Sequence, residues 1–368
     1  MGLYIILEQI HKTELMKIVY DNIIYALQRC GGISVVWSNL IQRCLKKDAD
    51  ILFMDYEHEN ISRADIDLPA GNIIRKRLSL PQVQRFINPS GKEFRINEPF
   101  IFHSSYYRTL SHPNAINITT VHDFMYSFYV KNPVSKFLHC KQQYDAIRKS
   151  DIVVCISENT KRDLLRLLPD VNPDKVKVIY NGVDKRFHRL KDAEYKDYFL
   201  FVGNRSGYKN FSAVIGPIAE CGFELKIVGP ALTQEEKELM ESNKLRYTYC
   251  GRVSDEELNM LYNEAFCFIY PSLYEGFGLP VLEAQMAGCP VLAVNTSSLP
   301  EIIGDRNLLL DSVTSDTLRE KIPLLRDPQS RKGIIENGLA NAARFSWDRM
   351  TEEYLMLYQS AIDNFHKD

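Results

Sequence analysis

The most constraining stretch of the sequence, residues 267–286, runs from an apolar segment through a loop into a helical segment. Residues 267–270 are typical of a buried strand. Residues from about 280 to 286 favour a helix, because its proline suits a first helical turn. Gly276 and Gly278 lie in the loop, and free N–H groups at such a helix start attract anions. The stretch therefore predicts a ligand site at the carboxyl end of a strand in an α/β fold.

Two carboxylates, Glu275 and Glu283, bracket this loop with seven residues between them. Glu275 is expected just after the strand, and Glu283 in the first helical turn. Carboxylates at these places can accept hydrogen bonds from sugar or ribose hydroxyls. Taken singly, each residue has an alternative interpretation: Glu275 as a solvated loop acid and Glu283 as a helix-capping residue.

The run Glu275-Gly-Phe-Gly-Leu-Pro-Val-Leu-Glu283 resembles the E-x7-E motif of retaining, nucleotide-sugar-dependent glycosyltransferases of family 4, and the likeness continues through Ala284 to Glu301. It covers nearly the whole chain from Met16. The resemblance implies the GT-B fold, which is α/β with two Rossmann-like domains facing a cleft. It also implies a retaining, metal-independent hexosyltransferase that needs no cofactor beyond its nucleotide-sugar substrate.

The length of 368 residues suits two domains of about 150–190 residues each. We expect an N-terminal acceptor domain at 1–190, with its core starting at residue 16. A C-terminal helix at 347–368 is expected to complete it. A donor domain is expected at 191–346.

A phosphate-binding loop is predicted after the strand at 198–202, where Arg205 and Lys209 lie in a glycine-containing segment. A guanidinium and an ammonium there can neutralise a departing diphosphate. The family usually places its arginine directly after the first glycine, whereas Asn204 intervenes here, so the case for Lys209 is the firmer one. A surface turn with two solvated cations is the alternative. The resemblance adds further donor contacts: Gly32, Gly278 and Leu279 at the phosphates, and Glu283, Val253, Pro280 and Val281 at the nucleotide.

An apolar strand at 116–121 leads directly into His122 and Asp123. A histidine there can hydrogen-bond a sugar hydroxyl or the leaving phosphate, although a lone histidine is more often structural. The string Thr120-Val-His-Asp123 resembles the active-site histidine segment of the bacterial mannosyltransferase-like branch of family 4. Glu275, His122 and Asp123 are therefore the predicted catalytic residues. The same branch suggests acceptor-side roles for Gly31, His103, Tyr106 and Arg108.

Charge is spread unevenly along the chain. Residues 16–190 carry 26 Lys and Arg against 18 Asp and Glu, whereas residues 191–368 carry 18 against 27. A positive half suggests an anionic partner, and a membrane surface fits the resemblance better than nucleic acid does. The helical region at 130–149, rich in lysine, is a candidate membrane face. Ordinary variation of surface charge is the alternative.

Composition indicates a cytoplasmic protein, and the charge asymmetry together with the resemblance suggests peripheral contact with the inner membrane. Hydrophobic residues make up 45% of the chain and charged residues 25%, as in soluble globular proteins. No apolar run approaches the ~18 residues of a membrane span. The eight cysteines show no CxxC pair and suit a reducing compartment.

No metal site is expected. Two Asp-x-Asp strings occur, Asp48/Asp50 and Asp65/Asp67. Metal-dependent glycosyltransferases of the other major fold place such a string after a strand. Here the first string precedes an expected strand and the second lies in an expected loop.

The predicted function is transfer of a sugar to a glycan or polyprenyl-linked saccharide during surface polysaccharide or O-antigen synthesis. Mannose is favoured as the sugar, and a GDP-sugar over a UDP- or dTDP-sugar. A GT-B sugar-nucleotide epimerase and a non-catalytic sugar- or nucleic-acid-binding protein remain alternatives. A Rossmann oxidoreductase would need a G-x-G-x-x-G turn, which neither predicted domain contains.

Overall fold

The computed structural model describes residues 16–47, 49–191, 193–205 and 207–365. The segment 1–15 and Asp48 of the first Asp-x-Asp string lie outside these residues. The chain folds into two compact units. The first combines Met1–Thr120, Lys141–Val154 and Thr351–Asp368, and the second combines Val121–Cys140 and Cys155–Met350. The domain ranges expected from the sequence stay a prediction.

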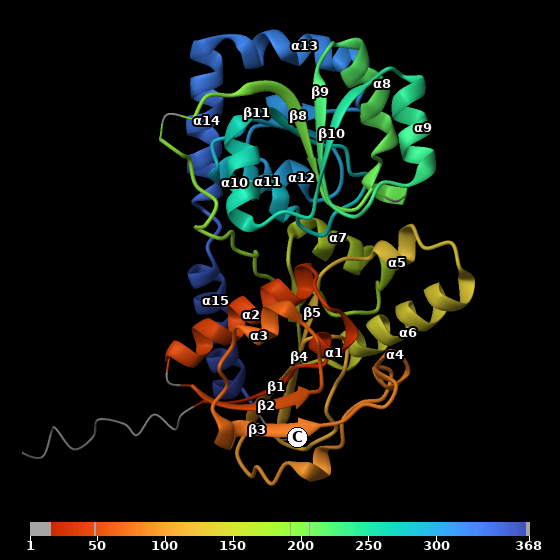
Figure 1. The fold of residues 1–368 in the computed structure, drawn as a ribbon. Helices are drawn as coiled ribbons and strands as arrows, with labels where there is room; N and C mark the ends of the chain where they lie inside the picture. The colour runs from red at the N-terminus through yellow and green to blue at the C-terminus, as the bar shows by residue number, and fades with distance from the viewer. Residues whose placement is uncertain (1–15, 48, 192, 206, 366–368) are drawn as a thin grey trace, which may run out of the picture. The chain divides into compact units, whose positions relative to one another are not determined.

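The first sheet has seven strands in the order β3-β2-β1-β4-β5-β6-β7. Figure 1 labels β1 to β5. Its strands are β1 Lys17–Asp21, β2 Asp50–Tyr56, β3 Ile73–Lys76, β4 Phe100–Ser104, β5 Ala115–Val121, β6 Ile152–Cys155 and β7 Val176–Val178. Strand β1 pairs in parallel with β2 on one side and β4 on the other, with Ile18 opposite Ile51 and Ile101. The strand order thus reverses at β1, and ligands of open α/β sheets bind at the carboxyl edge beside such a point.

Helices from the first half of the chain, together with the last helix, have the following bounds: α1 Ile24–Leu27, α2 Gly32–Cys44, α3 Ile61–Ala64, α4 Pro81–Gln84, α5 Met125–Phe128, α6 Pro133–Lys149, α7 Glu158–Leu167 and α15 Trp347–Asp363. The polar, broken sequence of residues 57–96 predicts only loops and short helices. Strand β3 corrects that expectation. It pairs in parallel with β2 at the edge of the sheet, where a strand needs only a short run of paired residues.

The second sheet has six strands in the order β10-β9-β8-β11-β12-β13, and all five neighbouring strand pairs are parallel. The strands are β8 Lys196–Val202, β9 Glu224–Val228, β10 Arg246–Gly251, β11 Ala265–Tyr270, β12 Val291–Val294 and β13 Leu309–Leu310. All six residues of β11 are buried, because helices cover a parallel sheet on both faces and leave its central strands dry.

Seven helices belong to the second sheet (Figure 1), with these bounds: α8 Ser212–Glu220, α9 Gln234–Ser242, α10 Asp255–Glu264, α11 Leu279–Met286, α12 Leu299–Ile302, α13 Ser315–Arg326 and α14 Pro328–Ala342. Local sequence sets several of their starts. Thr233 and Ser254 each accept a bond from the backbone of a glutamate three residues on, and that glutamate bonds back, which satisfies two free donors at each helix start. Together the two helix-covered parallel sheets confirm the predicted class of two Rossmann-like α/β domains.

The helix after the glycine loop, α11, begins at Leu279 with Pro280 as its second residue. The expectation that Glu283 falls in the first helical turn is therefore corrected: it lies in the second turn, and the first turn holds no acid. Gly278 precedes the helix at φ 109°, a conformation that side chains other than glycine rarely adopt. The glycine is thus what lets the loop enter the helix at this angle.

Within the described part of the chain, no helix combines the length and the apolar character that crossing a bilayer requires. All eight cysteines are free thiols, and Cys44, Cys155, Cys267 and Cys289 are buried.

Candidate active site

The loop of the predicted ligand site, residues 271–278, lies where strand β11 of the second unit ends, and we call it the reactive loop. The strand places Tyr270 at the carboxyl edge of the sheet, and residues 271–278 connect it to α11. The backbone N–H of Glu275 donates to Ser297 Oγ at 2.8 Å, and Ser298 Oγ donates to the carbonyls of Glu275 and Phe277. Because both serines follow β12, the neighbouring strand holds the loop in place.

Lys209 and Glu275 form the central ion pair of this edge. Nζ of Lys209 lies 2.6 Å from Oε1 of Glu275, and the two side chains are 20% and 12% exposed. The ammonium also lies 5.2 Å from the ring centre of Tyr208 and 5.7 Å from that of Tyr270, at distances where ring faces attract cations. Burial and the charge of Glu275 raise the pKa of Tyr270 well above its usual value. The pair is thus accessible yet held in a defined position.

Gly276 brings the segment of His122 and Asp123 against the reactive loop. A Cβ at Gly276 would overlap the carbonyl oxygen of His122, so no larger residue fits this approach. The carbonyl of Gly276 accepts bonds from Ser157 Oγ at 2.7 Å and Thr160 Oγ1 at 3.3 Å. The structure therefore brings together all three predicted catalytic residues, Glu275, His122 and Asp123, within one unit.

His122 and Asp123 both have shifted pKa values. Burial lowers the pKa of His122 to about 4, so its imidazole is neutral near pH 7. Burial raises the pKa of Asp123, and the charge of Glu275 adds to that rise, while the Met125 N–H and Lys209 oppose it. A neutral imidazole can donate and accept one hydrogen bond each, which suits contact with an uncharged hydroxyl.

Arg205 is held by the protein itself. Its Nε lies 2.9 Å from Glu236 Oε1, and its Nη2 donates to the carbonyls of Pro230 and Ala231 at 2.8 Å each. The side chain is only 4% exposed. Its Nη1 is buried and has no hydrogen-bond partner among the described residues. The phosphate role predicted for Arg205 stays a prediction and rests on this one group.

Glu283, the second carboxylate of the motif, has a different environment from Glu275. Its Oε2 accepts a bond from the buried Tyr262 hydroxyl at 3.4 Å. Burial raises its pKa to about 7, and the nearby Asp255 adds to this. Among the other residues predicted at the nucleotide, Val253 lies just past β10, and Pro280 and Val281 lie in the first turn of α11. Their ligand contacts stay predictions.

The residues predicted on the acceptor side behave unequally. His103 is fully buried, with Nδ1 2.6 Å from the Tyr358 hydroxyl and Nε2 2.9 Å from Thr120 Oγ1. Arg108 is buried against Asp21, with Nε 2.8 Å from Oδ2. Both are satisfied within the first unit, and their positions give no support to an acceptor contact.

The three other acceptor-side and phosphate positions predicted in the first unit, Gly31, Gly32 and Tyr106, are closer to solvent. Gly32 is exposed at the start of α2, with open space around its Cα. Gly31 precedes it, and a Cβ there would crowd the Gln28 side chain. Tyr106 is half-buried and accepts a bond from Arg85.

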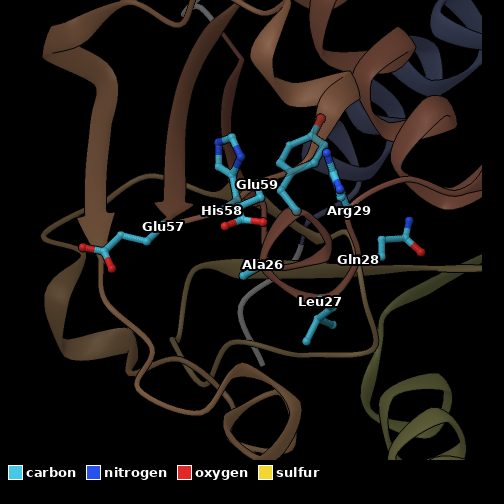
Figure 2. Close-up of a pocket in the computed structure, with 8 residues that line it drawn as sticks. Ala26, Leu27, Gln28, Arg29, Glu57, His58 and Glu59 are labelled. Carbon is cyan, nitrogen blue, oxygen red and sulfur yellow. The ribbon is translucent and has the colours of Figure 1, made fainter.

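A pocket of about 460 Å³ opens beside this glycine pair (Figure 2). It is lined by Tyr25, Ala26, Leu27, Gln28, Arg29, Glu57, His58 and Glu59. These residues follow β1 and β2, at the carboxyl edge of the first sheet. Burial lowers the pKa of His58, whose Nδ1 accepts a bond from the Asn60 N–H.

Sequence reasoning missed four residues that shape the reactive loop: Tyr208, Tyr270, Ser297 and Ser298. An aromatic residue next to a candidate phosphate-binding lysine, as Tyr208 is to Lys209, is a local signal that could have identified it. Ser297 and Ser298 follow another strand, and only the parallel pairing of β11 with β12 brings them to Glu275. Among the described residues, no group of three or more His, Cys, Asp or Glu side chains could hold a metal ion.

Comparisons with known proteins match both halves of the chain. Residues 30–187 match the family described as Glycosyltransferase Family 4, and residues 183–340 match Glycosyl transferases group 1. O-antigen chain mannosyltransferase B of Escherichia coli is 25% identical over 312 residues, which cover 78% of this chain and 81% of the relative. An uncharacterised glycosyltransferase of Methanocaldococcus jannaschii is 26% identical over 371 residues, covering 95% and 99%.

Solved structures share the fold. Sucrose-phosphate synthase of Thermosynechococcus elongatus superposes with a TM-score of 0.74 at 18% identity, covering 95% of this chain and all of that one. The Anabaena protein HepE, in complex with UDP and glucose, gives a TM-score of 0.68 at 16% identity, covering 94% and 100%.

Proposed function

The chain belongs to glycosyltransferase family 4, with the GT-B fold, and we propose that it transfers a hexose from a nucleotide-sugar with retention of configuration. Mannose is the favoured sugar, because O-antigen mannosyltransferases are among the relatives. The favoured acceptor is a glycan or polyprenyl-linked saccharide in surface polysaccharide or O-antigen synthesis.

The observation that carries this proposal is the Lys209–Glu275 pair beside the start of α11. In this structure the two charges neutralise each other. A bound diphosphate would take the ammonium of Lys209, and the freed Glu275 carboxylate would accept hydrogen bonds from hydroxyls of the transferred sugar. Negative charge grows on the diphosphate as the glycosidic bond breaks, so Lys209 stabilises the transition state more than the ground state. Gly278 and Leu279 add the partial positive charge of the helix start.

His122 would act as a neutral hydrogen-bonding group toward the sugar. Its low pKa keeps a second cation away from the developing positive charge on the sugar ring. Asp123, whose pKa is raised, lies beside it. We propose that the acceptor hydroxyl attacks the face from which the diphosphate leaves, with the leaving phosphate as proton acceptor. The new glycosidic bond forms as the sugar–phosphate bond breaks, and configuration is retained.

Glu283 is proposed to hold the ribose, with Val253, Pro280 and Val281 around the nucleotide. Its raised pKa makes it a group that can donate as well as accept near pH 7. GDP-sugars are favoured over UDP- and dTDP-sugars. The reaction is proposed to need no metal, because Lys209, the Nη1 of Arg205 and the α11 start supply the positive charge.

Peripheral membrane association is part of the proposal, at the cytoplasmic side of the inner membrane. At the start of α6, Val134 and Phe137 are 66% and 65% exposed, and Leu138 is exposed beside them. Lys131 and Lys136 lie in the same segment. Apolar side chains flanked by lysines suit an anionic bilayer surface. We expect the wild type to float with anionic vesicles and Phe137→Asp not to do so. Equal flotation of the two proteins would contradict membrane association through α6.

The first experiment is calorimetric titration with GDP, UDP, dTDP and NAD⁺, each in the presence of EDTA. We expect one nucleoside diphosphate to bind, and to bind much more weakly to Lys209→Ala. Labelled sugar nucleotides should then transfer to a membrane lipid extract. Conversion of the donor to an epimer without acceptor would favour the epimerase. Binding of NAD⁺ alone, or of nothing, would overturn the proposal.

A further inference from the structure

A second pocket of the second unit lies directly beside the reactive loop. Its volume is about 430 Å³, and it is open on one side. It is lined by Phe128, Tyr129, Asn159, Asp163, Arg166, Leu273, Tyr274 and Ser297. Neither Lys209 nor Glu283 is among the lining residues, so this pocket is separate from the proposed donor contacts.

The pocket and the reactive loop share their framework. Ser297 lines the pocket and also accepts the N–H bond of Glu275 at 2.8 Å. Ser297 adopts φ 48°, a left-handed conformation that costs energy for a residue other than glycine. Leu273, on the pocket wall, donates its N–H to the carbonyl of Tyr208, the neighbour of Lys209. A ligand in the pocket would therefore contact the same loop that carries Glu275 of the Lys209–Glu275 pair.

Aromatic rings form one side of the pocket. Tyr129 is 37% exposed, and its ring centre lies 5.7 Å from that of Tyr274 and 5.7 Å from that of Tyr208. Phe128 packs edge-on against Tyr274 at 5.3 Å. The hydroxyl of Tyr129 donates to the Leu273 carbonyl, which orients the ring while part of the residue stays exposed. An exposed, immobilised aromatic face is what a sugar ring can stack on at little entropic cost.

The polar groups of the pocket lining are matched in charge. Arg166 donates to Asp163 at 3.1 Å, and Tyr274 donates to the same carboxylate at 2.9 Å. The Arg166 side chain is 67% exposed, and its fork carries more donors than this single bond uses. Because Asp163 balances its charge, the pocket offers hydrogen bonds without a net positive field, which suits a neutral polyol better than a phosphate.

We propose that this pocket binds a saccharide unit of the acceptor, stacked on Tyr129 and hydrogen-bonded by Arg166. Its role as an acceptor subsite rests on the proposed transferase function, whereas its capacity to bind a neutral sugar does not. The Tyr129 ring sets preference for one sugar face, and Arg166 sets preference among hydroxyl orientations. The pocket thus makes residues next to Glu275 determinants of acceptor specificity.

The test is saturation-transfer NMR on the whole protein with three probes: the methyl α-glycosides of mannose, glucose and galactose. Inorganic pyrophosphate serves as the anionic probe. Four variants are compared: Tyr129→Ala, Arg166→Gln, Tyr195→Ala and His58→Ala. Tyr195 is a similarly exposed tyrosine outside the pocket, at 41%, and His58 lines the pocket of the first unit. Thermal unfolding of each variant establishes that it is folded.

We expect at least one glycoside to bind, with affinity about fivefold weaker in Tyr129→Ala and Arg166→Gln. Tyr195→Ala and His58→Ala should bind as the wild type does. Loss of binding in His58→Ala instead, displacement of the glycoside by pyrophosphate, or equal binding by all variants would overturn the inference.

The two proposals can fail separately. Nucleoside diphosphate binding without any glycoside binding would remove the saccharide pocket and leave the transferase proposal standing. Glycoside binding that depends on Tyr129, in a protein that binds no nucleoside diphosphate, would do the reverse.

Discussion

Two ion pairs at the carboxyl edges of the two sheets show how similar chemistry serves different ends. In the first unit Arg108 and Asp21 are 4% and 0% exposed, and in the second Lys209 and Glu275 are 20% and 12% exposed. Asp21 ends β1 in one sheet, and Glu275 follows β11 in the other. Position relative to the sheet therefore does not separate them.

The two pairs differ in how many hydrogen bonds their carboxylates accept from other side chains. Besides Arg108, the Asp21 carboxylate accepts bonds from the hydroxyls of Ser104 at 2.8 Å and Tyr56 at 2.9 Å. A guanidinium fork fits such a closed network, whereas the single ammonium of Lys209 is a point charge that can change partner. A closed pair is structural, and an accessible pair beside a helix start is suited to a ligand.

The largest effect is expected from Lys209→Ala. Turnover of the sugar nucleotide should fall by about 10²–10³, as for loss of one group that stabilises transition-state charge. The unfolding temperature should change little, since the pair is not fully buried. Lys332→Ala, at a lysine that is 74% exposed, is the matched control. Transfer rates measured with labelled donor check this. Near-wild-type turnover of Lys209→Ala would contradict the claim that the accessible pair serves a ligand.

Arg108→Ala should act on stability instead. Removing one partner of a buried pair leaves an uncompensated charge and costs about 3–5 kcal/mol of unfolding free energy. The control is Arg319→Ala, whose arginine is 54% exposed, and a loss under about 1 kcal/mol is expected there. Urea denaturation measures both. Should Arg108→Ala not fold, Arg108→Lys keeps the charge without the fork and is expected to lose part of the same energy. Full stability of either Arg108 variant would contradict the closed network.

Gly276→Ala tests the close approach that joins His122 to the reactive loop. The added methyl group would meet the His122 carbonyl, and forced displacement of packed backbone costs about 1–3 kcal/mol. Turnover should fall as well, because Glu275 moves with the loop. Gly333→Ala is the control, since nothing lies within 4 Å of that position in α14. There a gain of about 0.5–1 kcal/mol is expected. Unchanged stability of Gly276→Ala would show that the loop can relax away from His122.

Features set by neighbouring residues could be predicted from the sequence, whereas contacts made by the pairing of distant strands could not. The strand–loop–helix stretch at 267–286 predicted where the candidate site lies, because glycine and proline are strong local signals. The difference between Arg108 and Lys209 could not be predicted. Both are basic residues near strand ends, and only the fold surrounds Arg108 with Asp21 and Tyr56. Ser297 could not be predicted for the same reason, since its hydrogen bond with Glu275 depends on the parallel pairing of β11 with β12.

The smallest effect concerns two groups of the second unit with opposite pKa shifts. Glu283 has its pKa raised from 4.5 to about 7. Between these values the folded protein keeps a proton that the unfolded chain has lost, so Glu283 lowers stability as pH rises from about 4.5 to 7. His122 has its pKa lowered from 6.5 to about 4. There the unfolded chain holds the extra proton, so His122 raises stability as pH rises from about 4 to 6.5.

In the wild type the contributions of Glu283 and His122 to the pH dependence of the unfolding free energy have opposite signs. Their sum should therefore change little across this pH range. Glu283→Gln removes the falling slope and should expose the rise. Because both groups keep some exposure, a difference from wild type of about 1–3 kcal/mol is expected between pH 5 and 7. Urea denaturation at several pH values measures it, with His122→Asn expected to change the slope in the other direction. Parallel curves for wild type and Glu283→Gln would mean that Glu283 titrates like an ordinary exposed carboxylate. The contrast between Glu283 and Glu275 would then reduce to the ion pair that Glu275 makes with Lys209.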